Sequence, residues 1–179
     1  MSRPGLEFVP VHRAEQLDAI AVMAREIWYE YYVPIIGQAQ VDYMVAKFQT
    51  AEAMAAQVAS GYEYFVVRRS TSDVGYFALQ AQPEERRLFL SKLYLLGRSR
   101  GAGTGRACME FIERLGRERG LGLLWLTVNK GNPSVKVYER LGFRIAAEIV
   151  IDIGGGFVMD DYRMEKALGI QPVGPERQV

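Results

Sequence analysis

Cysteine and histidine are nearly absent from this chain of 179 residues, which contains one of each, Cys108 and His12. A single cysteine excludes an internal disulfide and a cysteine-cluster metal site, and a single histidine excludes a histidine-rich site. We therefore expect no bound metal ion. Cys108 falls on the apolar face of a predicted helix, so a small core residue is the favoured interpretation and a covalent nucleophile the alternative.

A surplus of either charge is also missing, because 22 lysines and arginines face 21 acidic residues and leave a net charge of +1. A nucleic-acid partner usually requires a strongly basic face, so none is expected. No apolar run approaches the roughly 18 residues that a membrane-spanning helix needs, and residues 1–16 lack the apolar core of a signal peptide. We expect a cytoplasmic protein with no membrane partner.

Two nucleotide-binding fingerprints are absent as well. The Walker pattern needs a Gly-Lys pair before serine or threonine, and the chain contains no such pair. The dinucleotide pattern G-x-G-x-x-G fails because Arg106 and Cys108 stand where its third glycine would fall. A generic nucleotide-binding domain is therefore the least favoured interpretation.

The chain is organised around the stretch LFLSKLYLLGRSRGAGTG, residues 88–105. Its first half is rich in Leu, Phe and Tyr and predicts a strand buried on both faces. Three alternating glycines follow, Gly101, Gly103 and Gly105, and a helical pattern starts at Thr104. Glycines at a strand-to-helix turn allow backbone N–H groups to converge, and a helix N-terminus favours anions. This turn is therefore a candidate phosphate site.

Three arginines, Arg98, Arg100 and Arg106, surround the start of that helix. Cations there are unfavourable by about 0.3–1 kcal/mol each, because the helix dipole is positive at this end. A multiply charged anion bound to the loop would offset this cost. The alternative is a solvated basic loop that ends a strand.

The rest of the chain alternates between helical and extended patterns. We predict strands over residues 6–11, 62–69, 74–82, 88–96, 123–128, 143–153 and 157–166, and helices over 14–32, 40–48, 50–60, 104–119 and 134–141. The strand, helix and strand over 88–128 imply a parallel pair, whereas the short connections elsewhere imply antiparallel hairpins. The expected fold class is α/β (α+β mixed), with a mixed, mostly antiparallel sheet, a central parallel pair and helices on both faces.

The chain shows no internal repeat and no linker that would divide it. Residues 1–168 are expected to form a single domain. Residues 169–179 contain two prolines and no periodicity, and are expected to form a flexible tail. Pro10 favours an edge position for the first strand, and the sequence PIIG at 34–37 predicts a break after the first helix.

Two motifs together resemble the GNAT superfamily of N-acetyltransferases. The first is Arg98-x-x-Gly101-x-Gly103, extended as RGAGTG, which is similar to the pyrophosphate-binding motif of that superfamily. The second is NPSVKVYERLGF, residues 132–143, which is similar to its short helix reading small-x-x-x-Tyr-x-x-x-Gly-Phe. The motifs stand in the expected order, and the resemblance covers residues 5–168. It implies acetyl-CoA as the donor and an amine as the acceptor.

The resemblance also implies which residues would bind the donor. Backbone groups of Leu93 and Leu95 would hold the pantetheine arm as an added strand, and N–H groups of the glycine loop would hold the pyrophosphate. The arginines would add positive charge. Asn132 would contact the arm or help shape its slot, although the spacing from Asn132 to Ser134 is one residue shorter than the commoner Asn-x-x-Ala. The expected donor site comprises Leu93, Tyr94, Leu95, Arg98, Arg100, Gly101, Ala102, Gly103, Thr104, Gly105, Arg106, Asn132 and Tyr138.

Tyr138 is the expected catalytic residue under this resemblance. A phenol beside the thioester sulfur can protonate the departing thiolate as a general acid. A backbone N–H near Leu95 would stabilise the negative charge on the carbonyl oxygen. The alternative is a core tyrosine on an amphipathic helix, with a hydroxyl that has found a partner.

The acceptor side is less clearly marked in the sequence. Four acids are candidate general bases, and each is more simply interpreted as a solvated surface group: Glu26, Glu30, Asp160 and Asp161. The aromatic end of the first helix would border the acceptor slot in this architecture and shape specificity. The expected acceptor-binding residues are Trp28, Tyr29, Glu30 and Tyr32.

The predicted function is transfer of an acetyl group from acetyl-CoA directly to a primary amine of a small molecule, either a polyamine or an amino-acid-like compound. Acetylation of protein N-termini or lysines is a second hypothesis, which an open, peptide-wide groove would favour. A noncatalytic acyl-CoA-binding module is a third, and the presence of Tyr138 argues against it. A homodimer is left open.

Overall fold

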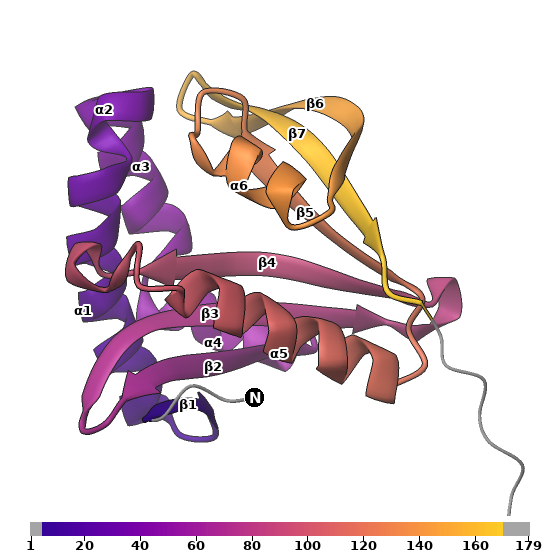
Figure 1. Cartoon of the computed structure of the whole chain (residues 1–179). Coiled ribbons are helices and arrows are strands. Elements are labelled where there is room, and N and C mark those ends of the chain that lie inside the picture. Colours follow the sequence, from indigo (N-terminus) through magenta and orange to yellow (C-terminus); the bar gives the residue numbers. More distant parts are fainter. Residues whose placement is uncertain (1–4, 170–179) are drawn as a thin grey trace, which may run out of the picture.

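The computed structural model describes residues 5–169, a sheet with helices on both sides (Figure 1). The strands are β1 Leu6–Pro10, β2 Tyr62–Arg69, β3 Ser72–Gln82, β4 Arg87–Leu95, β5 Leu123–Asn129, β6 Arg144–Gly154 and β7 Phe157–Ala167. The helices are α1 Ala14–Tyr31, α2 Val33–Ile36, α3 Gln38–Phe48, α4 Ala51–Ala59, α5 Thr104–Glu118 and α6 Ser134–Arg140. Within these residues, no helix is both long enough and apolar enough to cross a bilayer.

The strands form one sheet in the order β1-β2-β3-β4-β5-β7-β6. Neighbours pair antiparallel except β4 and β5, which are parallel because α5 carries the chain back between them. The predicted fold class, a mixed and mostly antiparallel sheet with a central parallel pair, is confirmed. β1 lies at one edge, as Pro10 predicts, and β6 lies at the other.

Each face of the sheet has its own hydrophobic core. α5 packs its apolar stripe on one face, where Cys108, Met109 and Ile112 are at most 1% exposed. Burial raises the pKa of the Cys108 thiol to about 12, so Cys108 is a core residue with no thiolate to act as a nucleophile. α1, α3 and α4 cover the other face, where Ile20 and Tyr76 are fully buried.

Two local predictions need correction, and a third concerns residues that the structure does not describe. The predicted break after the first helix is a single helical turn, α2, with Pro34 in a first-turn position where its missing N–H is tolerated. β4 is not buried on both faces, because burial alternates along it, with Leu88, Leu90 and Lys92 buried between half-buried neighbours. The predicted flexible tail, apart from Gly169, lies outside the described residues.

The parallel pairing of β4 and β5 is short. It ends at Leu90 and Leu126 after four residue pairs, and beyond that point the strands diverge (Figure 1). β4 has a bulge at Ser91, where its register with β3 shifts by one residue. Such a bulge bends a strand, which directs β4 away from β5. The ends of the two strands, at Leu95 and Asn129, therefore lie apart on either side of a cavity.

Candidate active site

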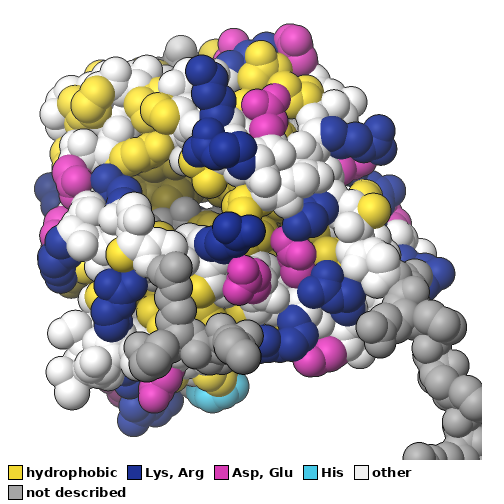
Figure 2. All heavy atoms as spheres, viewed as in Figure 1, with side chains coloured by type: hydrophobic (Ala, Val, Ile, Leu, Met, Phe, Trp, Pro, Cys, Tyr) yellow, Lys and Arg dark blue, Asp and Glu magenta, His cyan; other side chains and the backbone are white. Residues whose placement is uncertain are grey.

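A cavity of about 680 Å³ opens where β4 and β5 diverge. Its walls are residues 89–95 of β4, residues 126–129 of β5, the start of α5, part of α6 and the aromatic end of α1. Figure 2 shows the hollow, with hydrophobic side chains at its rim and Lys and Arg side chains beside it. Both sequence motifs contribute to the wall, since the glycine loop and Tyr138 line it.

The glycine loop takes a backbone conformation that other residues disfavour. Gly101 and Gly103 have φ of +78° and +76°, in the left-handed region, and Gly103 caps the N-terminus of α5. A Cβ at Gly101 would meet no atom within 4 Å, so conformation rather than space favours glycine there. The first turn of α5 leaves N–H groups without intrahelical acceptors beside the cavity, which Gly105 and Arg106 also line. This end of the cavity therefore offers an anion site.

Two residues of the predicted loop, Ala102 and Thr104, are not part of the cavity wall. Thr104 is 1% exposed, and its Oγ1 accepts a hydrogen bond from Nη2 of Arg69 on β2. This contact fixes the start of α5 against the sheet. The side chain of Thr104 therefore has a structural partner, and a ligand at the loop could use the backbone of this residue alone.

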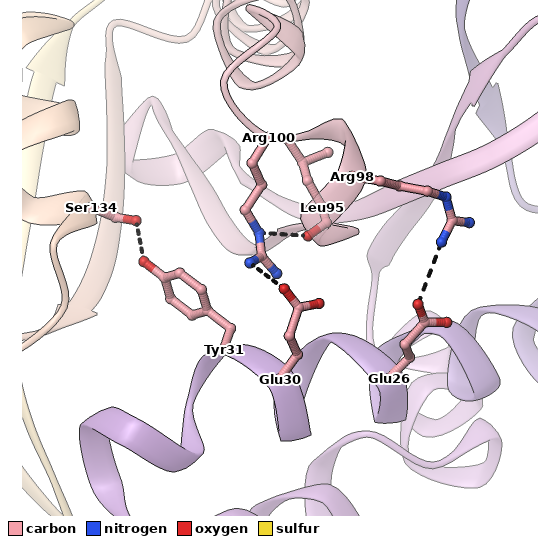
Figure 3. Close-up of polar contacts among 7 residues, drawn as sticks. All are labelled: Glu26, Glu30, Tyr31, Leu95, Arg98, Arg100 and Ser134. Carbon is pink, nitrogen blue, oxygen red and sulfur yellow. Dashed lines mark hydrogen bonds and ion pairs between the residues drawn. The ribbon is translucent and has the colours of Figure 1, made fainter.

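Arg98 and Arg106 each pair with a glutamate, so their charge is already offset within the protein. Arg98 contacts Glu26 at 3.5 Å and lies outside the cavity wall (Figure 3). Arg106 lines the wall and contacts Glu110 at 3.4 Å. The expected group of three arginines that needs an anion for neutralisation is therefore not what the structure shows. The glycine geometry and the helix start support the anion site instead.

Arg100 reaches from the loop to the aromatic wall. Its Nε donates to the Leu95 carbonyl at 3.0 Å and its Nη1 donates to Glu30 at 3.2 Å (Figure 3). Its guanidinium carbon lies 4.6 Å from the centre of the Tyr31 ring. Among the described residues its buried Nη2 has no hydrogen-bond partner, so this nitrogen can donate to a ligand in the cavity.

β4 presents an unpaired backbone edge to the cavity. Beyond Leu90 the described residues give it no partner on the β5 side, while its other edge remains paired with β3. The N–H of Leu96 donates to the Val74 carbonyl. Because hydrogen-bonded and non-bonded pairs alternate in antiparallel strands, the backbone groups of Leu93 and Leu95 point away from β3 and toward the cavity. An extended ligand needs this geometry to add as a strand.

Tyr138 lines the cavity from α6, on the same side of the sheet as α5. It is half-buried, and its ring packs edge-on against Phe143 with the centroids 5.6 Å apart. Burial raises the pKa of Tyr138 well above its usual range, and the nearby phenol of Tyr31 adds to the rise. The hydroxyl therefore stays protonated at neutral pH and is able to donate a proton.

Asn132 joins α6 to α1 at the cavity wall and is 5% exposed. Its Oδ1 accepts hydrogen bonds from the Ser134 N–H at 2.8 Å and from the Tyr31 hydroxyl at 2.7 Å. Its Nδ2 donates to the Tyr32 hydroxyl at 3.4 Å. The contact with Ser134 has the form of a helix cap. The polar atoms of Asn132 are thus engaged with the protein, so this residue shapes the wall.

Aromatic rings from α1 and β4 form another part of the cavity wall. Trp28 stacks on Tyr32 with centroids 4.3 Å apart, and Tyr94 meets these rings edge-on at 5.5 Å and 6.1 Å. Of the predicted acceptor residues, Trp28 and Tyr32 line the cavity, whereas Tyr29 and Glu30 do not. Tyr29 instead hydrogen-bonds a carboxylate on α3. The structure therefore brings together half of the predicted acceptor set.

Asp161 of β7 places a carboxylate in the cavity wall. It is 7% exposed, and it accepts a hydrogen bond from the Thr127 side chain. Burial raises the pKa of Asp161 to about 6, and the neighbouring Asp160 adds to the rise. The surface interpretation is therefore wrong for Asp161, whereas Glu26, Glu30 and Asp160 are exposed and held in ion pairs.

Several wall residues carry no motif and were not predicted. Lys92 is 6% exposed, and its Nζ donates to the Phe48 carbonyl at 3.2 Å and to Gln49 at 3.3 Å. Burial lowers the pKa of Lys92 to about 8. The other wall residues that sequence interpretation missed include Gln40, Met44, Thr127, Asn129 and Met159.

The family model described as "Acetyltransferase (GNAT) family" matches residues 22–143. The chain therefore belongs to this family. The resemblance seen in the two sequence motifs is confirmed.

Known proteins similar to this chain include a streptothricin acetyltransferase and several solved structures. Streptothricin acetyltransferase of Streptomyces lavendulae is 36% identical over 70 residues, which span 38% of this chain and 37% of that protein. PaiA N-acetyltransferase from Thermoplasma acidophilum, solved with coenzyme A, has a TM-score of 0.72 at 17% identity and covers 90% of this chain and 98% of its own. Spermidine/spermine N-acetyltransferase SpeG from Vibrio cholerae, solved with manganese ions, has a TM-score of 0.65 at 18% identity, with coverage of 92% and 93%. The two structures show the same fold.

Proposed function

We propose that this acetyltransferase transfers the acetyl group of acetyl-CoA to a primary amine of a small molecule. The observation that carries the proposal is the continuity of the cavity. One space of about 680 Å³ joins the start of α5, the unpaired edge of β4 and Tyr138. These features match, in order, a pyrophosphate, an amide-bearing arm and a thioester. A similar structure contains coenzyme A, which supports the choice of donor.

The donor would be held mainly by backbone groups. N–H groups at Gly103, Thr104 and Gly105 would bind the pyrophosphate, because the start of a helix is an anion site. Leu93 and Leu95 would pair with the pantetheine arm along the open edge of β4. The loop conformation and the unpaired edge of β4 both fit this donor. A sheet in which β4 and β5 paired along their whole length would need neither feature. Arg100 Nη2, which has no partner among the described residues, would donate at the phosphate end.

The chemistry would follow from groups that face the same space. Acetyl-CoA supplies a thioester, which an uncharged amine can attack at the carbonyl carbon. Tyr138 would protonate the departing sulfur, because its phenol lines the cavity and is protonated at neutral pH. The N–H of Leu95 points into the cavity and would stabilise negative charge on the carbonyl oxygen.

A small acceptor fits the way the cavity is enclosed. Gln40 on α3 donates to the Val158 carbonyl at 2.8 Å, and Tyr43 on α3 donates to the Ile153 carbonyl at 2.6 Å. These contacts tie α3 to the β6–β7 hairpin across the acceptor side, where a protein acceptor would need a peptide-wide groove. Two similar proteins are named for streptothricin and for spermidine and spermine, which are small molecules. We therefore propose a polyamine or an amino-acid-like amine as the acceptor.

Thermal unfolding with and without acetyl-CoA tests the donor. A ligand at about 100 times its dissociation constant adds about 2.7 kcal/mol to the free energy of unfolding, which should raise the midpoint by roughly 5–10 °C at this size. NAD and ATP serve as controls, and neither should shift the midpoint. An unchanged midpoint at saturating acetyl-CoA would contradict the proposed function.

An amine panel with acetyl-CoA then tests turnover. Release of free thiol with at least one primary amine would support the transferase proposal. Binding of acetyl-CoA without turnover of any amine would favour the noncatalytic module. The extent of the single domain over residues 1–168, the cytoplasmic location and the homodimer stay predictions.

A further inference from the structure

Asp161 and Tyr138 reach the cavity from opposite faces of the sheet. Asp161 stands across from Asn129 in the register of β5 and β7. It shares its strand face with Met159, which packs against the core under α1 and α3. Tyr138 packs against the core under α5. A ligand between β4 and β5 therefore has a phenol on one side and a carboxylate on the other.

Asp161 has no cationic partner among the described residues. Its neighbour Asp160 is exposed, and its Oδ1 lies 2.8 Å from Nζ of Lys130. Lys92, the lysine in the cavity wall, donates to the Phe48 carbonyl instead. Buried charges in proteins are usually paired, because an unpaired one loses its hydration without compensation. A carboxylate placed in this way requires either a proton or a cation from the ligand.

Aromatic groups stand within electrostatic reach of this carboxylate. Burial is the main cause that raises the pKa of Tyr32 and Tyr94 in the aromatic wall, and the charge of Asp161 adds a smaller rise to both. Trp28 stacks beside Tyr32 and completes the wall. Aromatic faces attract ammonium ions electrostatically. A buried carboxylate among such rings is the chemistry of an ammonium site.

We propose that Asp161 binds the acceptor amine as its ammonium ion and accepts the first proton that leaves its nitrogen. This inference rests on the proposed function and narrows the acceptor to cationic aliphatic amines. Asp161 acts here both as a specificity group and as the general base. Neutral acceptors such as alcohols and aryl amines would leave the buried carboxylate without a counter-charge.

The proposed step balances in atoms and electrons. One proton passes from the ammonium to Asp161, and the freed electron pair of nitrogen forms the new bond to the carbonyl carbon. The bond from that carbon to sulfur breaks, and its electron pair stays on sulfur. Tyr138 protonates the sulfur and is restored by the second proton that leaves nitrogen. The proton on Asp161 passes to water, so each turnover releases one proton.

Ligand pairs that differ only in an ammonium group replaced by a hydroxyl test this proposal without turnover. The full-length protein is saturated with coenzyme A, which carries no acetyl group. Binding of 2-phenylethylamine and 1,5-diaminopentane is then measured by calorimetry at pH 7.5 against 2-phenylethanol and 1,5-pentanediol. We expect at least one amine to bind tenfold or more tightly than its alcohol. If no amine exceeds its alcohol, the proposal is overturned.

Two single-residue variants locate the effect. Asp161→Asn should abolish the preference for the amine. Asp160→Asn removes the same charge from the neighbouring, exposed residue and should leave the preference unchanged. A preference that persists in Asp161→Asn overturns the assignment. Coenzyme A is titrated into the wild type and both variants. Failure of the wild type to bind it would contradict the proposed function, whereas intact binding without an amine preference contradicts the role of Asp161 alone.

The pH dependence of the wild type gives a readout that needs no variant. The free carboxylate titrates near its pKa of about 6, so the preference should fall as the pH is lowered from 7.5 to 5, while both amines stay charged. The groups that face Asp161 do not reproduce this loss. Tyr32 and Tyr94 stay neutral throughout because burial raises their pKa values, and Lys92 gains charge mainly near its pKa of about 8. A preference that is constant over this range overturns the proposal.

Discussion

Burial raises the pKa of both Tyr138 and Asp161, with opposite chemical consequences. A phenol with a raised pKa stays protonated at neutral pH and can donate. A carboxylate with a pKa of about 6 is ionised at neutral pH and still close enough to neutrality to take up a proton and release it again. Two groups shifted in this way on opposite sides of one cavity suit an acid and a base.

Tyr138→Phe isolates the acid. We expect turnover to fall by about 10²-fold or more, since a general acid typically contributes about 10²–10⁴-fold, while the affinity for acetyl-CoA stays nearly unchanged. Steady-state kinetics and acetyl-CoA titration measure the two quantities. The matched control is Tyr62→Phe, which removes a phenol outside the cavity wall. Equal turnover in the wild type and in Tyr138→Phe would remove Tyr138 as the acid.

Asp161→Asn should also change stability, in a direction opposite to its effect on binding. The folded-state pKa is raised from 3.8 to about 6, so the native state binds the proton more tightly than the unfolded chain. The stability from this protonation is fully present below pH 4 and is lost as the pH rises to 6. Above that, the ionised wild type carries a penalty of about 3 kcal/mol that the neutral variant lacks.

Urea unfolding without ligand measures this difference. We expect Asp161→Asn to be more stable than the wild type at pH 7.5 and to lose the advantage at pH 4. Asp160→Asn, in an exposed ion pair, should differ from the wild type by less than about 1 kcal/mol at both pH values. If Asp161→Asn is less stable than the wild type at pH 7.5, then the ionised carboxylate does not lower the free energy of unfolding in the ligand-free protein.

At the scale of elements, two helix starts define the site. α5 begins at a left-handed glycine, and α6 begins where Asn132 accepts the N–H of Ser134. Both were predictable, because alternating glycines after a strand and an Asn-Pro pair are strong local signals. α2 was not predictable as a helix, since a four-residue turn has too few positions to show a period. The bulge at Ser91 also has no sequence signature of its own, although it re-aims the edge that faces the cavity.

Gly103→Val tests the loop as a donor site. Valine in the left-handed region costs about 1–2 kcal/mol and places a side chain where the phosphate would approach. Gly120→Val is a matched control, because Gly120 has φ +70° just beyond α5 and a Cβ there would meet no atom within 4 Å. Both variants should lower the unfolding midpoint, and Gly103→Val alone should weaken acetyl-CoA binding. Equal donor affinity in the two variants would show that the loop does not hold the pyrophosphate.

At the scale of the whole molecule, the sheet could be predicted and the acceptor side could not. The strand–helix–strand of β4, α5 and β5 fixes a parallel pair, and short connections fix the antiparallel ones. The environment of Asp161, by contrast, depends on where β7 and α1 meet across 130 residues of chain. Asp160 and Asp161 are adjacent and chemically identical, so local pattern offers little to separate the exposed one from the buried one. At the end of α1, Tyr31 lines the cavity and Tyr29 does not, and local pattern does not separate these two tyrosines either.

Four residue pairs join the β5–β7–β6 part of the sheet to the rest through β4. Under the proposed function, the donor occupies the place of an absent strand beside Leu93 and Leu95. The end of β4 then has a hydrogen-bonding partner on its β5 side only while donor is bound, and each release of product exposes it again. The cellular supply of acetyl-CoA would thus govern how often this end of β4 is paired, and amide hydrogen exchange at these two leucines would report that fraction.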